Sequence, residues 1–511
     1  MTVLDVPLVT PDQRAAVLAQ VPTELLIGDW RSAEGAASFV VEDPATREEL
    51  LRVADASAAD GVAALDAAVE AAPGWAALSP RERSDILRRW YEAIMDRADD
   101  LALVITLEMG RPLAESRGEV EYAADYIRWY AEEAVRLNGR HTTSPDGRSR
   151  IVTGPKPVGP CLLITPWNFP LAMAARKIAP ALAAGCTVVL KPAELTPLAS
   201  LFAARLMLEA GVPAGVVNVI TTTDPAAVCG TLMADPRLRK VSFTGSTAVG
   251  QILVEQSAPQ LVRTSMELGG NAPLIVLDDA DLERAVEGAV VAKLRNGGQS
   301  CVAANRILVQ DGIADAFVAA FTKAVSAVQL GPGSQPGVGL GPLIDDRAVA
   351  KCTALVADAV ASGATVLVGG EAPSRPGYFF PATVLDNVAP TARILSEEVF
   401  GPVAPIVRFE TEDEAVALAN DTPFGLASYV FTENIDRALD VADRLETGMV
   451  GINQGVVSNV AAPFGGIKHS GMGREGGPEG IEEYLETKYL AVNTKPGVAR
   501  VEMPGTSTAA V

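Results

Sequence analysis

Apolar residues recur at helical spacing between about residues 60 and 138. In the segment 81–95, Leu, Ile, Trp and Tyr fall three or four residues apart among charged side chains, which is the period of one buried face of an α-helix. Long Ala-rich segments carry the same period through the rest of this region. This part of the chain is therefore predicted to be helical.

Between about residues 158 and 277 the pattern changes to short β-branched runs separated by helices. The runs are 161–165, 186–190, 216–220, 241–243 and 274–277. Strands that alternate with helices predict crossover units and a parallel sheet, which binds ligands at the carboxyl ends of its strands. Thr196 and Pro197 predict the N-cap and first residue of one helix, and Gly211 its left-handed C-terminal residue.

A second α/β domain is predicted after residue 280. A helix over 281–294, a Gly-rich turn and a strand over 306–309 are followed by further alternation to about residue 450. A chain of 511 residues also exceeds the size at which one core keeps growing, so at least two domains are expected. Residues 1–26 are interpreted as a leader and residues 498–511 as a frayed tail.

Composition excludes several classes of function. The net charge of −21 argues against binding to nucleic acid or to an anionic membrane, because proteins that bind either of them need basic patches. No apolar run approaches the roughly 20 residues that span a bilayer, and the start lacks a basic segment leading into an apolar one, so a cytoplasmic enzyme is expected. Five scattered cysteines and two histidines predict neither disulfides, nor a metal site, nor Ser-His-Asp catalysis.

Two motifs fit a dinucleotide. Phe243-Thr-Gly-Ser-Thr-Ala-Val-Gly250 leads from a strand into a helix, and a helix N-terminus suits a pyrophosphate. Lys191 and Glu194 follow another strand, where a ribose would lie, and the carboxylate would repel a 2′-phosphate and so favour NAD over NADP. The alternatives are a plain strand-to-helix turn and a solvated ion pair on a loop.

Three further motifs fit nucleophilic chemistry. Cys301 lies on the Gly-rich loop 297–302, which can supply the access and lowered pKa of a reactive thiol, whereas the other four cysteines have apolar neighbours typical of buried residues. Glu267 precedes paired glycines and is either a general base in an apolar site or a strand-end partner in a salt bridge. Asn168 lies between Pro166 and Pro170 and is either an oxyanion donor or part of a turn that is rigid for packing.

Taken together these motifs resemble the aldehyde dehydrogenase superfamily, from about residue 27 to about 495. The matching stretches are Pro166-Trp-Asn-Phe-Pro170, Lys191-Pro-Ala-Glu194, Phe243-Thr-Gly-Ser246, Glu267-Leu-Gly-Gly270, the Cys301 loop, Glu398-Val-Phe-Gly-Pro402 and Pro463-Phe-Gly-Gly-Ile-Lys468. The resemblance implies an α/β fold with a Rossmann-type dinucleotide domain (27–145 and 161–266), an α/β catalytic domain (267–470) and a small β oligomerisation arm (146–160 and 471–497).

The same resemblance implies roles for single residues. Cys301 is the nucleophile, Glu267 the base for thioester hydrolysis, and Asn168 with the Cys301 backbone N–H the oxyanion hole. Lys177 and Glu475 match a proton relay. The implied cofactor-binding residues are Thr165, Trp167, Lys191, Glu194, Gly245, Ser246, Gly250, Leu268, Glu398 and Phe400.

Within the family, residues 265–273, 464–475 and 480–486 are similar to the succinate-semialdehyde dehydrogenases. That subgroup implies Arg176, Arg295 and Ser458 as ligands for the far carboxylate of a small aldehyde, since guanidinium groups bind carboxylates bidentately; the two arginines could instead pair with surface acids. Glutarate semialdehyde is the alternative substrate, because one methylene changes binding by only about 1–3 kcal/mol. The alternative classes are a hydrolase that uses Cys301 and a non-catalytic relative.

The resemblance also implies NAD as cofactor, with NADP possible, and a homodimer or homotetramer. This chain departs from the family at three places. Glu194 replaces the smaller residue of members that prefer NADP, which favours NAD. Ala303 stands where the subgroup often has a second cysteine, so a disulfide in the catalytic loop is excluded. The stretch Thr221-Thr-Thr-Asp224 replaces the usual glycine on the adenine side of the pocket.

Overall fold

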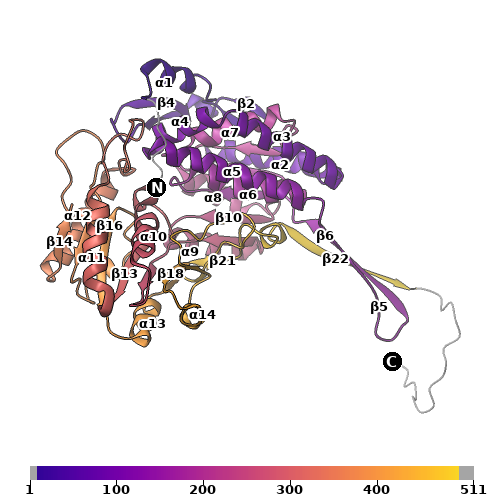
Figure 1. Cartoon of the computed structure of the whole chain (residues 1–511). Coiled ribbons are helices and arrows are strands. Elements are labelled where there is room, and N and C mark those ends of the chain that lie inside the picture. The colour runs from indigo at the N-terminus through magenta and orange to yellow at the C-terminus, as the bar shows by residue number, and fades with distance from the viewer. Residues whose placement is uncertain (1–7, 494–511) are drawn as a thin grey trace, which may run out of the picture.

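Two large β-sheets form the body of the protein, and a narrow β-arm projects from it (Figure 1). The structure is a computed structural model that describes residues 8–493. The tail predicted over 498–511 and the last residues of the predicted arm lie outside this range. The described part of the predicted leader contains α1 (Pro11–Leu18), whose Val17 and Leu18 lie in a hydrophobic core.

The first sheet has five parallel strands at its centre and antiparallel strands at its edges. Its order is β2 (Asp29–Arg31), β1 (Leu25–Ile27), β9 (Val217–Val219), β8 (Val188–Lys191), β7 (Cys161–Ile164), β10 (Lys240–Thr244), β11 (Arg263–Glu267) and β21 (Gly471–Met472). Because the chain runs outward from β7 on one side and resumes at β10 on the other, the order reverses between these two strands. A doubly wound sheet binds its ligand in the crevice at such a point.

Helices cover both faces of this sheet. One face packs against α6 (Pro170–Ala184) and α7 (Leu198–Glu209), with α3 (Pro80–Asp96), α4 (Ala98–Met109) and α5 (Leu113–Glu133) outside them. The other face packs against α2 (Ala58–Ala77), α8 (Pro225–Ala234) and α9 (Thr247–Ser257). Between these layers β7, β8, β9 and β10 are buried along their whole length, as parallel strands between helices must be, and β11 is buried over its last three residues.

The second sheet is parallel except for one edge strand. Its order is β14 (Thr365–Val368), β15 (Thr383–Asp386), β16 (Val403–Phe409), β13 (Ala304–Gln310), β12 (Ala272–Val276), β18 (Ala427–Phe431) and β19 (Met449–Ile452). One face packs on α10 (Leu282–Leu294) and α11 (Asp311–Ser326). The other packs on α12 (Asp346–Ala361), α13 (Glu412–Asn420) and α14 (Ile435–Arg444).

The arm is a three-stranded antiparallel sheet far from both cores (Figure 1). It consists of β22 (Leu485–Asn493), β6 (Ser149–Pro157) and β5 (Arg140–Thr143), and Leu485 pairs with Pro157 at its root. The smaller elements are the pairs β3 (Ser38–Glu42) with β4 (Glu49–Ala54) and β17 (Phe424–Gly425) with β20 (Ile467–Lys468), the helix α15 (Glu479–Glu482), and the 3₁₀ turns η1 (Glu34–Ala36), η2 (Ala258–Gln260), η3 (Arg295–Gly298) and η4 (Arg393–Leu395).

The predicted architecture is confirmed, with local differences. The helical region becomes α2 to α5, and four of the five predicted strands become β7, β8, β9 and β10. The fifth run, 274–277, lies in β12 of the second sheet, and β11 was not predicted because Arg263, Thr264 and Ser265 interrupt any apolar run. None of the helices within residues 8–493 is long and apolar enough to cross a membrane.

The predicted N-terminus of α7 is wrong by one position. The hydroxyl of Thr196 donates to the backbone oxygen of Trp167 instead of capping the helix. Glu108 of α4 takes that role, since its two carboxyl oxygens accept hydrogen bonds from the backbone N–H groups of Leu198 and Ala199 at 2.7 and 2.9 Å. At the other end Gly211 has a φ of +93°, as predicted for the residue that follows the helix.

Candidate active site

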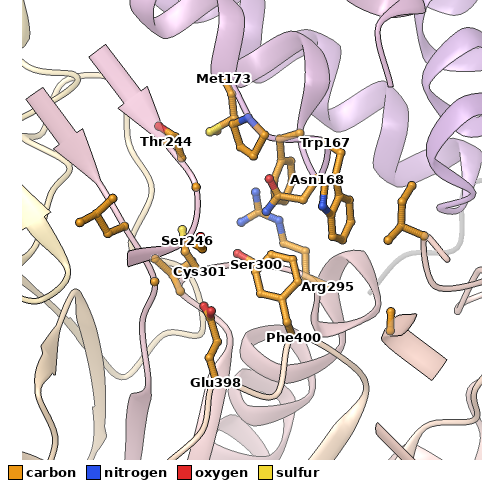
Figure 2. Close-up of a pocket in the computed structure, with 18 of the residues that line it drawn as sticks. Trp167, Asn168, Met173, Thr244, Ser246, Arg295, Ser300, Cys301, Glu398 and Phe400 are labelled. Atoms are coloured by element: carbon orange, nitrogen blue, oxygen red, sulfur yellow. The ribbon is translucent and has the colours of Figure 1, made fainter. Parts of the chain in front are cut away.

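A cavity of about 340 Å³ opens where the carboxyl ends of β7 and β10 face the second sheet. Figure 2 shows its lining side chains arranged around one space. They include residues of the turn between β7 and α6, the turn between β10 and α9, the loop after η3, the segment before β16 and the segments after β11 and β19. Residues from all of these segments line it, among them Trp167, Asn168, Thr244, Gly245, Ser246, Leu268, Arg295, Cys301, Glu398, Phe400 and Ser458.

Cys301 is the one half-buried cysteine of the described residues, whereas Cys161, Cys186, Cys229 and Cys352 are fully buried. This distinction was predicted. The lowered pKa was not borne out, because burial raises the pKa of the Cys301 thiol to about 12. Arg176 works against this shift, and the carboxylates of Glu398 and Glu267 add to it. The free protein therefore holds the thiol protonated near neutral pH.

Two glycine contacts shape the loop that carries the thiol. Gly298 has a φ of +72°, and a Cβ there would lie 2.3 Å from the backbone oxygen of Gly401. A Cβ on Gly270 would lie 2.3 Å from the backbone oxygen of Cys301. Only glycine permits such approaches, so the turn after β11 packs directly against the cysteine.

The side chain of Asn168 is held firmly beside the same cavity. Its Nδ2 donates to the backbone oxygen of Gln299 at 3.0 Å, which leaves the second amide hydrogen of Asn168 for a ligand. Its own backbone oxygen accepts from Arg111 at 2.9 Å and from Asn296 at 3.0 Å. Asn168 and Cys301 thus line one space, as an oxyanion site requires.

Glu267 is the last residue of β11, but the structure does not place it in the cavity lining. It is 3% exposed, and neither carboxylate oxygen has a hydrogen-bond partner. Its Oε1 lies 2.9 Å from the position of a Cβ on Gly465. Burial, reinforced by the charge of Glu475, raises the pKa of Glu267 well above its ordinary value. A raised pKa makes a carboxylate a stronger base, which suits a group that takes a proton from water.

Arg176, Lys177 and Glu475 form a buried charge cluster behind the cavity. Both basic groups pair with the Glu475 carboxylate, and Lys177 also donates to the Ser242 hydroxyl at 2.9 Å. Although burial alone would raise it, the pKa of Glu475 is lowered by these two cations. Arg176 therefore pairs with a buried acid and not with the surface acid of the alternative interpretation, and it also lines the cavity.

Arg295 lines the cavity without the ion pair that holds Arg176. It begins η3, directly after α10, is half-buried, and lies 5.3 Å from the ring centroid of Phe169. No carboxylate of the described residues lies within ion-pair distance of it. Ser458 lines the same cavity. A ligand carboxylate would meet an available guanidinium and a hydroxyl here.

The end of the cavity at the first sheet fits a dinucleotide. Ser246 caps α9, and the preceding Gly245 lines the cavity at this helix N-terminus. The hydroxyl groups of Thr165 and Thr244, at the ends of β7 and β10, are buried without a hydrogen-bond partner. Such orphaned donors beside a helix N-terminus at the reversal point of a parallel sheet are suited to a pyrophosphate and ribose.

Six further residues predicted to bind the cofactor lie in three pairs. Lys191 ends β8 and pairs with Glu194 at 3.1 Å, outside the lining of this cavity. Gly250 leaves room for Leu268, since a Cβ there would lie 2.4 Å from the leucine side chain. The rings of Trp167 and Phe400 meet edge to face at 5.4 Å.

Glu398 lines the cavity together with the loop that carries Cys301. Its carboxylate accepts from the Gly270 N–H at 3.1 Å, and burial raises its pKa to about 7. Sequence reasoning missed Tyr122, Arg347 and Lys351, which also line the cavity. These residues lie on α5 and α12 without a local motif, so only the fold brings them to the site.

Comparison with known proteins agrees with this geometry. A family model described as "Aldehyde dehydrogenase family" matches residues 30–490. A succinate-semialdehyde dehydrogenase of Paenarthrobacter nicotinovorans is 54% identical and covers 87% of this chain and 98% of its own. An NADP(+) succinate-semialdehyde dehydrogenase of Escherichia coli K12 is 50% identical over 92% of this chain and 97% of its own. A glutarate-semialdehyde dehydrogenase of Pseudomonas putida is 49% identical over 91% and 96%.

Solved structures give the same result. The crystal structure of a succinate-semialdehyde dehydrogenase from Burkholderia pseudomallei superposes with a TM-score of 0.92 at 49% identity, over 93% of this chain and 99% of its own. A betaine aldehyde dehydrogenase from Staphylococcus aureus, solved in complex with NAD+, superposes with a TM-score of 0.91 at 36% identity, over 94% and 97%.

Proposed function

The chain belongs to the aldehyde dehydrogenase family, and from this membership we propose that it oxidises succinate semialdehyde to succinate through a thioester on Cys301. The observation that carries the proposal is that the half-buried thiol lines one cavity with the Asn168 amide, the Arg295 guanidinium and the turn between β10 and α9. NAD is the proposed electron acceptor and NADP a possible one, in line with the cofactors named for the relatives.

In this proposal the residues of the chain divide the reaction among them. The Cys301 thiol gives up its proton to solvent as its sulfur adds to the aldehyde carbon, and Asn168 Nδ2 with the Cys301 backbone N–H donates to the alkoxide that forms. A bound nicotinamide ring supplies the hydride acceptor. Glu267 turns from its place beside Gly465 toward the acylated cysteine and takes a proton from the water that hydrolyses the thioester. The Lys177–Glu475 pair then carries that proton away through the buried cluster.

The binding roles follow the same division. Thr165, Gly245 and Ser246 hold the pyrophosphate end of the dinucleotide, with Gly250 and Leu268 packed beneath it. Lys191 and Glu194 bind the adenosine ribose, Glu398 the nicotinamide ribose, and Trp167 with Phe400 encloses the ring. Arg176, Arg295 and Ser458 bind the far carboxylate of the substrate. Glutarate semialdehyde is the second candidate, because relatives of nearly the same identity carry that name.

The domain division belongs to the same proposal. Residues 27–145 and 161–266 bind the dinucleotide, residues 267–470 carry the catalytic loop, and residues 146–160 and 471–497 bridge subunits. Exposed apolar side chains on β22 support the assembly of a homodimer or homotetramer. A cytoplasmic location stays a prediction of the sequence.

Transient kinetics with reduced-nicotinamide absorbance test this function. Cys301→Ala should abolish oxidation of succinate semialdehyde. Glu267→Gln should release a burst of about one reduced cofactor per active site and then stop, because acylation proceeds and hydrolysis does not. Cys186→Ala, which alters a buried cysteine away from the cavity, is the matched control and should turn over normally. A full steady rate in either active-site variant contradicts the assignment.

A further inference from the structure

Arg111 lies between α4 and α5, in a segment whose backbone is held by close contacts with Gly333. Gly110 before it has a φ of +89°, and the Leu113 N–H donates to the Gly333 oxygen at 3.0 Å. A Cβ on Gly333 would lie 2.0 Å from the Arg111 oxygen. The side chain is 2% exposed and does not line the cavity. Its position is therefore fixed by packing, and it is out of reach of a ligand there.

The guanidinium of Arg111 holds the turn that carries Asn168 at two points. Its Nη2 donates to the Asn168 backbone oxygen at 2.9 Å and also pairs with the Glu119 carboxylate. Glu119 in turn accepts from the N–H groups of Leu171 and Ala172, both at 2.9 Å, at the start of α6. The three residues from Asn168 to Pro170 are thus tethered before and after.

The same network reaches the cysteine loop. Phe169 lies 4.7 Å from the Arg111 guanidinium and 5.3 Å from that of Arg295. Glu115 accepts from the Asn296 N–H at 2.7 Å, and the Asn296 amide donates to both Asn168 and Gln299. The N-terminal turns of α5 therefore set the distance between the Asn168 amide and the loop of Cys301.

A buried ion pair of this kind is a poor source of stability. Desolvation of both charges offsets their attraction, and apolar residues of similar volume often stabilise a fold as well. An oxyanion donor, in contrast, loses much of its effect when it is displaced by about 1 Å. The Arg111–Glu119 pair is better matched to orienting a backbone turn than to stabilising the fold.

We propose that Arg111 is a positioning residue, which places the Asn168 amide for the oxyanion of the reaction. This inference rests on the proposed function, because it assigns Arg111 an effect that acts only through Asn168. Arg111 touches neither substrate nor cofactor, so its loss should lower kcat while the KM for NAD stays close to that of the unaltered protein.

A double-mutant cycle between Arg111 and Asn168 tests the proposal. In the unaltered background Arg111→Met should lower kcat for succinate semialdehyde by about 10- to 100-fold. The Asn168→Ala substitution itself should lower kcat by about 100- to 1,000-fold. In that background Arg111→Met should lower kcat further by less than about threefold, because no amide remains to be placed. Equal factors in the two backgrounds, or an unchanged kcat in the single variant, overturn the proposal.

Two further variants distinguish a folding defect from a loss of positioning. Arg83 is a buried arginine that donates to the Ala183 oxygen at 3.1 Å, at the opposite end of α6. Arg83→Met should lower the melting temperature without the loss of kcat. If Arg111→Met does not fold, the cycle is run with Arg111→Lys, which keeps the charge beside Glu119, and the same non-additivity is required. An unaltered protein with no aldehyde oxidation would instead refute the proposed function.

Discussion

The thiol of Cys301 lies among groups that mostly oppose its ionisation. Burial raises its pKa to about 12, and only Arg176 among the charged neighbours lowers it. The Gly-rich loop alone suggested the reverse, because free backbone N–H groups near a thiol stabilise a thiolate. The burial that dominates the shift is set by the tertiary fold, and the carboxylates that add to it, Glu267 and Glu398, stand far from Cys301 in the sequence. The greater exposure of Cys301 was therefore predictable, and its raised pKa was not.

The pH dependence of alkylation checks this environment. Because the thiol pKa lies at about 12, the rate of reaction of the cofactor-free protein with iodoacetamide should rise about tenfold per pH unit from near pH 7 to near pH 10. Labelling of Cys301 is followed by mass spectrometry, with Cys301→Ala as the blank for the four buried cysteines. A plateau below about pH 9 would contradict the raised pKa.

The Arg295 side chain should determine selectivity for a carboxylate-bearing aldehyde. We expect Arg295→Leu to raise KM for succinate semialdehyde about 10- to 100-fold, since a hydrogen bond to a charged group contributes about 1.5–3 kcal/mol. KM for butyraldehyde, which has the same number of carbons and no carboxylate, should change less than about threefold. Arg176 is a less informative target because its loss also strips Glu475 of a partner.

A comparable effect of Arg295→Leu on both aldehydes would show that Arg295 supports packing around Phe169 and does not bind substrate. A panel that includes glutarate semialdehyde, measured with NAD and with NADP, distinguishes the two proposed substrates in the same assay.

At the scale of secondary structure, local sequence patterns identified apolar strands and amphipathic helices well. They failed where the residue that caps a helix, or the strand that pairs with another strand, lies far away in the sequence. Thr196 has the side chain of an N-cap, yet Glu108 provides the cap from 90 residues away. The polar strand β11 is recognisable only because it pairs with β10 along its whole length. The run 274–277 has the composition of its predecessors, and only the topology assigns it to the other sheet.

The burial of Glu108, the residue that caps α7, should make stability depend on pH. Burial raises the pKa of this carboxyl from 4.5 to about 8, so between these values the folded protein retains a proton that the unfolded chain has lost. This contribution is complete below the unfolded pKa and is lost as pH rises through about 8. Melting temperatures of the protein and of Glu108→Gln, compared at pH 5 and pH 8, should reveal it.

The expected result is that the melting temperature of the unaltered protein, relative to Glu108→Gln, falls by roughly 3 °C or more between the two pH values. A constant difference would mean that Glu108 ionises normally in the fold. Glu82→Gln, which alters the N-terminal capping box of α3 at the surface, serves as the control for a helix cap without burial.

At the scale of the whole molecule, the site is assembled by contacts that no local motif encodes. Lys177 meets Glu475 across 298 residues of sequence, and Asn168 meets Gln299 across 131. The segment that carries Glu475 continues through α15 into β22 of the arm. Lys240 contacts both Glu483 and the ring of Tyr484 at the root of that strand. The arm is thus continuous with the buried charge cluster behind the cavity.

The free edge of that arm gives the last prediction. β22 is an edge strand whose Leu490 and Val492 project to one face and are 49% and 42% exposed, and an exposed apolar edge strand pairs readily with another chain. Leu490→Glu with Val492→Glu should reduce the mass in solution, measured by light scattering, to that of one chain. The pair Ile435→Glu with Leu439→Glu removes two apolar groups of α14 that are more exposed than Leu490 and Val492 and should leave the mass unchanged. An unaltered protein that is already one chain, or an arm variant that keeps its assembly, would show that this edge does not join subunits.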